Sequence, residues 1–134
     1  MDEPNPSPLI QSIDGVQHHV PDLEAGVRFY HDLLGHEIIW RTETAVGFRM
    51  PDSDAEIVIQ NEREYQETDL KVDSADDAAN RIQESGGCVV VPPFDIPIGR
   101  AVVVEDPWGN RMVLLDSSKG KLLTDVDGNV TGVA

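Results

Sequence analysis

Residues 15–25, GVQHHVPDLEA, decide the fold, because a related stretch, ETDLKVDSADD, follows 52 residues later at 67–77. Each stretch opens on an alternating run and passes through a polar turn into a run with helical periodicity. A glycine ends each run, Gly35 in the first copy and Gly87 in the second. A repeat of this length is stronger evidence for the architecture than any local motif. It predicts two copies of one β-α-β-β-β unit, with a cleft between them.

Hydrophobic periodicity predicts the helices and strands of each copy. The elements expected in the first copy are a strand at 13–20, a helix at 23–34 and strands at 36–41, 45–50 and 56–60. Those expected in the second copy are a strand at 68–73, a helix at 75–85 and strands at 88–91, 100–105 and 111–116. The predicted fold class is therefore α+β, with tandem β-α-β-β-β modules forming a half-open curved sheet.

A chain of 134 residues with 40% hydrophobic content fits one domain with one core. We place this domain at 13–118, with module one at about 13–60 and module two at about 67–116. Residues 1–12 are predicted to be a flexible leader, since the first eight are acidic and rich in proline. Residues 119–134 are predicted to form a C-terminal hairpin or tail.

The net charge of −15 comes from 25 acidic residues against 10 basic ones. Such a surface repels nucleic acid and anionic membranes, so we expect neither as a partner. No apolar run approaches the roughly 20 residues of a membrane helix, and the first residues lack the pattern of a signal peptide. We therefore expect a cytoplasmic protein. The single Cys88 heads an apolar run, which predicts a buried structural thiol rather than a nucleophile.

Two motifs resemble those of the vicinal oxygen chelate superfamily, which includes glyoxalase I, extradiol dioxygenases and bleomycin-resistance proteins. The first is VPDLEAGVRFY at 20–30, followed by LLG at 33–35. The second is DPWGNR at 106–111, which is similar to the closing Asp-Pro-x-Gly-Asn turn of the superfamily. The resemblance runs from about residue 13 to residue 116. It implies paired modules around a cleft, and it also implies a homodimer.

The same resemblance places the ligands of metal-using members at four strand positions that face the cleft. These positions fall here on Gly15, Val58, Glu67 and Val113. A divalent ion needs three or more donors, and only Glu67 supplies one. We therefore expect no metal cofactor, with open space at Gly15 where relatives place a histidine. If a divalent metal such as Zn, Ni, Mn or Fe is bound, the expected ligands are His19 and Glu67.

Strand alternation selects the side chains expected to face the cleft. Gln17 and His19 share one face of the first strand, whereas His18 shares the opposite face with apolar residues and is predicted to pack toward the helices. The repeat places a matching set in the second module, consisting of Glu67, Asp69 and Lys71. Two interpretations stay open for these residues, a polar floor that orients a ligand and a solvated strand face.

Three further residues are candidates for contact with a ligand. Arg111 could hold a carboxylate or phosphate, although pairing with the surplus of acidic residues explains it equally well. Trp108, in the turn at 106–110, is expected to be exposed at the mouth of the cleft. Residues 92–99 hold three prolines and a glycine, which predicts a loop, and Phe94 in this loop is a candidate lid. Plain packing remains the alternative for both rings.

We therefore expect a protein that binds a small organic molecule in the cleft, without a metal at the superfamily position. One alternative is a metal-dependent, glyoxalase-like lyase or isomerase, or a dioxygenase, with a rearranged ligand set. A second alternative is a dimeric interaction module. The chain has no phosphate-binding glycine loop and no Gly-x-Ser-x-Gly elbow. Fold alone does not choose among these functions, and whether the protein is an enzyme stays open.

Overall fold

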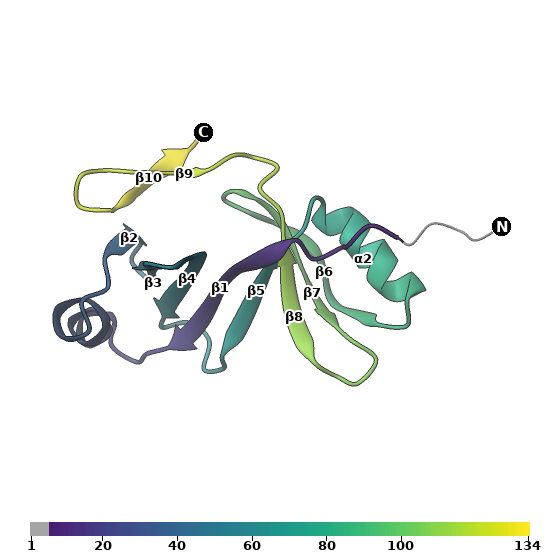
Figure 1. Cartoon of the computed structure of the whole chain (residues 1–134), viewed down its shortest axis with the longest axis horizontal. Helices are drawn as coiled ribbons and strands as arrows, with labels where there is room; N and C mark the ends of the chain where they lie inside the picture. The colour runs from purple at the N-terminus through teal and green to yellow at the C-terminus, as the bar shows by residue number, and fades with distance from the viewer. Residues whose placement is uncertain (1–5) are drawn as a thin grey trace.

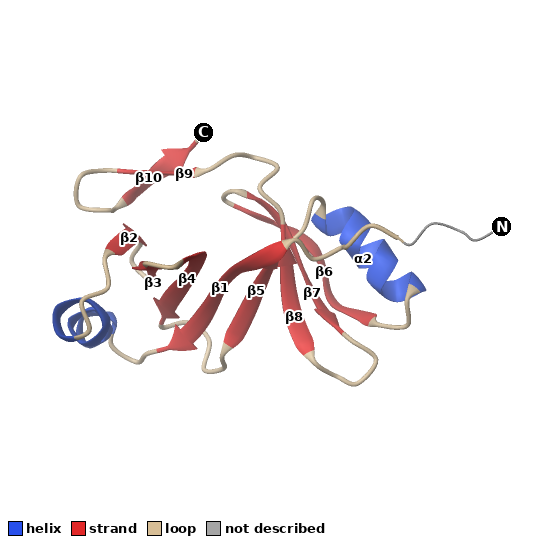
Figure 2. Ribbon diagram, viewed as in Figure 1, coloured by secondary structure: helices blue, strands red, loops and turns tan. Residues whose placement is uncertain are grey.

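The computed structural model describes residues 6–134. The strands of its main sheet are β1 (Ser12–His19), β2 (Ile38–Arg41), β3 (Ala45–Met50), β4 (Ser53–Gln60), β5 (Glu67–Lys71), β6 (Cys88–Ile96), β7 (Gly99–Glu105) and β8 (Arg111–Leu115). Within the described residues they form a mixed sheet in the order β2-β3-β4-β1-β5-β8-β7-β6 (Figure 1). Figure 2 shows the helices at the two flanks of this curved sheet. The predicted α+β class and paired modules are confirmed.

The sheet contains the predicted duplication. β1 and β5 pair in antiparallel fashion at its centre, with Val16 opposite Thr68. These two residues are separated by the repeat offset of 52 positions, so an approximate two-fold axis passes between them. β4 pairs parallel with β1, and β8 pairs parallel with β5, so each module contributes the same arrangement to the sheet.

The first helix differs in type from the prediction. α1 (Leu23–Val27) begins after Asp22, whose side chain accepts hydrogen bonds from the backbone N–H groups of Glu24 and Ala25. The helix then continues as a π-helical segment, η1 (Arg28–Leu33). Residues 23–34, predicted as one α-helix, therefore adopt two helical forms. Gly35 ends the segment at a φ of 82°, which glycine adopts without steric cost.

Each helix covers the outer face of one module, so the apolar interior has two main parts instead of the single core expected. The part under α1 and η1 is built on Val46, Phe48 and Ile59. α2 (Ala75–Glu84) buries its alanine-rich face against the other part, which includes Val72, Val102 and Leu114. Because each of the described helices packs on one part only, the sheet itself is the common element of the two modules.

The proline-rich segment is a strand and not the predicted loop. β6 runs through Pro92 and Pro93 at the edge of the sheet and pairs with β7. An edge strand tolerates prolines because its outer side has no neighbouring strand to which it must donate hydrogen bonds. Cys88, predicted to be buried, is exposed at the first position of this edge strand. The apolar run that suggested burial begins only after it.

Part of the predicted flexible leader is held against the domain. Leu9 packs on the core beneath α2, and the carbonyl of Ser7 accepts a hydrogen bond from Arg81 of that helix. The backbone N–H of Gln11 donates to the carbonyl of Lys71 at 2.9 Å. Residues 7–11 are therefore attached to module two, while residues 1–5 lie outside the described residues. None of the helices between residues 6 and 134 has the length and apolar character needed to cross a membrane.

The predicted C-terminal hairpin is present as β9 (Leu122–Thr124) and β10 (Val130–Val133). Figure 1 shows it in yellow, above the concave side of the sheet. At one end the backbone N–H of Arg41, in β2, donates to the carbonyl of Gly128 at 2.8 Å. At the other end the N–H of Lys119 donates to the carbonyl of Ile98, between β6 and β7, at 2.8 Å. The hairpin therefore bridges the two modules.

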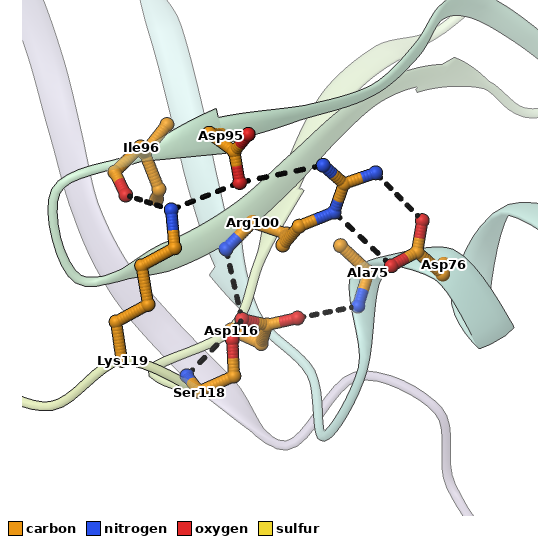
Figure 3. Close-up of polar contacts among 8 residues, drawn as sticks. All are labelled: Ala75, Asp76, Asp95, Ile96, Arg100, Asp116, Ser118 and Lys119. Carbon is orange, nitrogen blue, oxygen red and sulfur yellow. Dashed lines mark hydrogen bonds and ion pairs between the residues drawn. The ribbon is translucent and has the colours of Figure 1, made fainter.

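A buried carboxylate anchors the segment that leads into this hairpin (Figure 3). Asp116 is 3% exposed and accepts hydrogen bonds from the backbone N–H groups of Ala75 at 2.8 Å and Arg100 at 2.9 Å. The hydroxyl of Ser118 also donates to it, at 2.7 Å. Burial favours the neutral form, but these donors outweigh burial and lower the pKa of Asp116. The surrounding ion pairs are Arg100–Asp76, Arg100–Asp95 and Lys119–Asp95.

Candidate functional site

A cavity of about 620 Å³ lies between the concave face of the sheet and the C-terminal hairpin. β1, β4 and β5 supply its floor, and Leu122 and Val130 of the hairpin contribute to its roof. Ile98 closes the side toward β6 and β7, and Trp40 of β2 closes the opposite side. Its size and its mixture of apolar walls with a few polar groups are typical of sites that enclose a small molecule.

Asp69 lies on the floor of this cavity and is 4% exposed. Its Oδ2 accepts a hydrogen bond from Nε2 of Gln17 at 2.7 Å, whereas its Oδ1 has no donor among the described residues. Burial is the largest of the causes that raise the pKa of Asp69 to about 8, and contact with the carboxylate of Glu67 is the next. At neutral pH Asp69 is therefore largely protonated, and its hydroxyl can donate to Glu67.

A chain of contacts holds this part of the floor in place. Nη2 of Arg63 donates to Oε1 of Gln17 at 2.6 Å. Nε of Arg63 lies 3.2 Å from Oε1 of Glu67, close enough for an ion pair but without the geometry of a hydrogen bond. Gln60 is 2% exposed and bonds both the backbone N–H and the carbonyl of Arg63. These contacts fix the side chains on the floor before a ligand arrives.

Trp40, Glu56 and Asp14 line the other half of the cavity. The indole N–H of Trp40 donates to the carboxylate of Glu56. Gly47 lies directly beneath the ring, where any Cβ would overlap the indole nitrogen. Burial raises the pKa of Glu56 and repulsion by Asp14 adds to it, although the Trp40 hydrogen bond opposes the change. Burial also raises the pKa of Asp14, with Lys71 opposing it.

The predicted strand faces agree with the structure, but the predicted residues divide between two cavities. Gln17, Asp69 and Lys71 line the cavity of about 620 Å³. Glu67 and Arg111 line a neighbouring cavity of about 390 Å³.

The two histidines of β1 lie on opposite faces. Nδ1 of His18 lies 3.1 Å from the hydroxyl of Tyr30 on the helix side, as predicted. His19 follows on the opposite face and is not part of the lining of either cavity.

The predicted aromatic contacts and the candidate cation lie away from the large cavity. Trp108 is 83% exposed at the turn between β7 and β8, and Phe94 is 38% exposed on the edge strand. Ile96 lines the cavity where Phe94 was expected. Nη2 of Arg111 lies 3.1 Å from Oε2 of Glu105. This arginine is therefore paired with an acidic residue, which was the alternative to ligand binding.

Asp14, Glu56 and Arg63 were not predicted from the sequence, and Trp40 was not among the predicted ligand contacts. Simple alternation assigns Asp14 to the helix face, but the register shifts between Ile13 and Gly15 and turns its side chain toward the cavity. Val58 was expected to face the cleft, and alternation puts Glu56 on the same face of the strand. The position of Glu56 could therefore have been predicted from the sequence. Trp40 and Arg63 carry no comparable signal, because their positions depend on tertiary contacts.

Residues 12–114 match the sequence model of the Glyoxalase/Bleomycin resistance protein/Dioxygenase superfamily. The chain belongs to this superfamily. The match covers both modules and confirms the resemblance carried by the motifs at 20–35 and 106–111. No curated protein sequence matches the chain significantly.

Solved structures share the superfamily fold. Methylmalonyl-CoA epimerase from Mycobacterium tuberculosis has a TM-score of 0.71 and 17% identity, over 85% of this chain and 93% of that one. Homoprotocatechuate 2,3-dioxygenase from Brevibacterium fuscum has a TM-score of 0.60 and 20% identity, over 84% and 38%. Mn(II)-bound glyoxalase from Novosphingobium aromaticivorans has a TM-score of 0.59 and 18% identity, over 94% and 42%. The chain therefore spans less than half the length of the latter two.

The residues at the metal positions expected for this superfamily do not fit a divalent ion. Gly15, Val58 and Val113 offer no side-chain donor, and Glu67 is paired with Arg63. Among residues 6–134, no three His, Cys, Asp or Glu side chains are arranged to hold a metal. Nor does Gly15 leave the open space that was predicted. A Cβ there would lie 2.9 Å from the carbonyl oxygen of Glu56, so any side chain would displace the β4 backbone.

Proposed function

We propose that the protein binds a small organic molecule in the cavity beneath the C-terminal hairpin, without a divalent metal at the superfamily position. The observation that supports this most strongly is the cavity of about 620 Å³, whose floor is held in place by hydrogen bonds. Affinity would come from apolar surface buried between the floor and the hairpin, and orientation would come from the polar groups. The lack of donors at Gly15, Val58 and Val113 supports the metal-free part of the proposal.

The metal-dependent alternative is less well supported, because it requires His19 and Glu67 to act together. Glu67 lines the smaller cavity and is engaged by Arg63, whereas His19 lines neither cavity. A site with one available carboxylate and water would hold a divalent ion only weakly.

Metal analysis and a blocked cavity test the proposal together. Protein purified without added metal is expected to contain far less than one equivalent of Zn, Ni, Mn or Fe. In a fragment library screened by NMR, the compounds that bind should lose affinity in Val130→Trp, which fills the roof of the cavity. Val126→Trp is the matched control, since Val126 is fully exposed at the tip of the same hairpin. Stoichiometric metal that disappears in Glu67→Ala, or binding that survives Val130→Trp, would overturn the proposal.

We further propose that the protein is a cytoplasmic homodimer. Three apolar side chains on η1 and at its C-terminal cap support a dimer because they are at least half exposed, namely Phe29 at 50%, Leu33 at 65% and Leu34 at 52%. Exposed apolar surface of this kind often marks a protein contact. Size-exclusion chromatography with light scattering measures the mass of the protein in solution. A monomer at micromolar concentration would contradict the dimer.

A further inference from the structure

Three carboxylates from three different strands line the same cavity. They are Asp14 on β1, Glu56 on β4 and Asp69 on β5. Glu56 accepts a hydrogen bond from the indole of Trp40, and Asp69 accepts one from the amide of Gln17. Both donors are neutral, so neither cancels a negative charge. A buried carboxylate without a compensating cation is unfavourable, and Asp69 also has an oxygen without a donor among the described residues.

The cations of the described residues compensate this charge only in part. Lys71 and Lys121 line the cavity, so two ammonium groups face three carboxylates. Arg63 is already paired with Glu62 and Glu67 outside this group. Arg49, which acts on Glu56 at longer range, is paired with Glu37. These two ammonium groups match Asp14 and Glu56 while Asp69 is neutral, and a positive charge supplied by a ligand would balance Asp69 in its ionised form.

Trp40 indicates which kind of cation the cavity suits. Its ring is fixed between Gly47 and the carboxylate of Glu56, and it lines the cavity. The face of an aromatic ring attracts ammonium groups, and especially quaternary ammonium groups. The alkyl groups around a quaternary nitrogen are apolar and pack on the ring, while the positive charge is attracted to its face. A compact metal ion requires converging oxygen donors instead, and residues 6–134 do not offer such a group.

We infer that the ligand of this cavity is an organic cation whose ammonium or quaternary nitrogen lies between the indole of Trp40 and the carboxylates of Asp14, Glu56 and Asp69. This inference rests on the proposed binding function and adds the chemical class of the ligand. The apolar remainder of the ligand lies against the hairpin, where Leu122 and Val130 line the cavity.

The experiment compares three small aromatic probes on the full chain by NMR titration. Benzyltrimethylammonium carries a permanent positive charge, benzyl alcohol is neutral, and benzoate is negative. The cation is expected to bind about tenfold or more tightly than the alcohol, with benzoate the weakest.

Variants separate this inference from the binding proposal. Asp69→Asn removes a negative charge from the cavity and should weaken binding of the cation, and Trp40→Leu should weaken the cation without weakening the alcohol. Asp52→Asn, in an exposed turn, is the matched control and should leave all three affinities unchanged. If benzoate binds most tightly and loses this affinity in Lys71→Met, the inferred positive charge of the ligand is wrong, but the cavity still binds a small molecule. If none of the probes binds, the inference fails, and the proposed function fails with it only if binding of library fragments is also insensitive to Val130→Trp.

Discussion

Replacing Asp69 by asparagine is expected to stabilise the protein at neutral and alkaline pH. The folded state holds the proton of Asp69 up to a pKa of about 8, whereas the ordinary value is 3.8. Between these values the unfolded chain releases a proton that the folded chain retains, so the free energy of unfolding falls as the pH rises. One pKa unit corresponds to about 1.36 kcal/mol, so the free energy of unfolding at pH 8 is lower than at acidic pH by on the order of 5 kcal/mol.

Asparagine avoids this loss because it keeps the shape of a protonated aspartate. Its oxygen can accept the hydrogen bond from Gln17, and its NH2 group can donate to Glu67. The two proteins should therefore have similar unfolding free energies near pH 4, and the variant should be more stable by several kcal/mol near pH 8. That difference is a large part of the stability of a typical domain, which is about 5–15 kcal/mol.

Urea unfolding followed by circular dichroism between pH 4 and pH 9 measures this difference. Molar salt in every sample screens the repulsion from the net charge of −15, so that the local effect dominates. Asp52→Asn removes one charge from an exposed turn and serves as the control. If wild-type stability increases from pH 5 to pH 8, or if Asp69→Asn is the less stable protein at pH 8, the assignment of a buried neutral carboxyl is wrong.

Two substitutions test other parts of the fold. Asp116→Ala should lower the unfolding free energy by about 3 kcal/mol, because it leaves the N–H of Ala75 without its acceptor, whereas Ser118→Ala should cost only about 1 kcal/mol. Equal losses in thermal unfolding would contradict the central role of the carboxylate. Gly15→Ala should cost about 1–3 kcal/mol, because the new Cβ would press on the β4 backbone at 2.9 Å. Gly132→Ala, where the nearest atom lies at 3.9 Å, should have a much smaller effect, and identical melting temperatures would refute the steric argument.

Local periodicity predicted the elements whose residues keep a regular pattern. β3 (Ala45–Met50) has the expected limits at both ends, and the repeat offset places Val16 opposite Thr68. The failures arise where neighbouring elements decide the outcome. The prolines of β6 looked like a loop because a sequence does not reveal which strand will lie at the edge of a sheet. The π-helical form of η1 has no counterpart in the spacing of its apolar residues.

The candidate site was predictable to the extent that a strand alternates strictly. Gln17, Asp69 and Lys71 were found because they follow the period of two along β1 and β5. Asp14 was missed because one irregular position in β1 reverses its direction. The aromatic wall was assigned to Phe94 and Trp108, which are exposed, although Trp40 supplies it. That choice depends on the close approach of the ring to Gly47, a contact between adjacent strands.

The C-terminal hairpin breaks the approximate two-fold symmetry of the sheet. Gln17 and Asp69 are counterparts under the repeat offset, and they bond to each other across the approximate two-fold axis. The hairpin follows the second module only, and it reaches across to β2 of the first. An unduplicated tail thus makes the two halves of a duplicated floor inequivalent. A molecule held there therefore contacts the hairpin above it and two inequivalent modules below it.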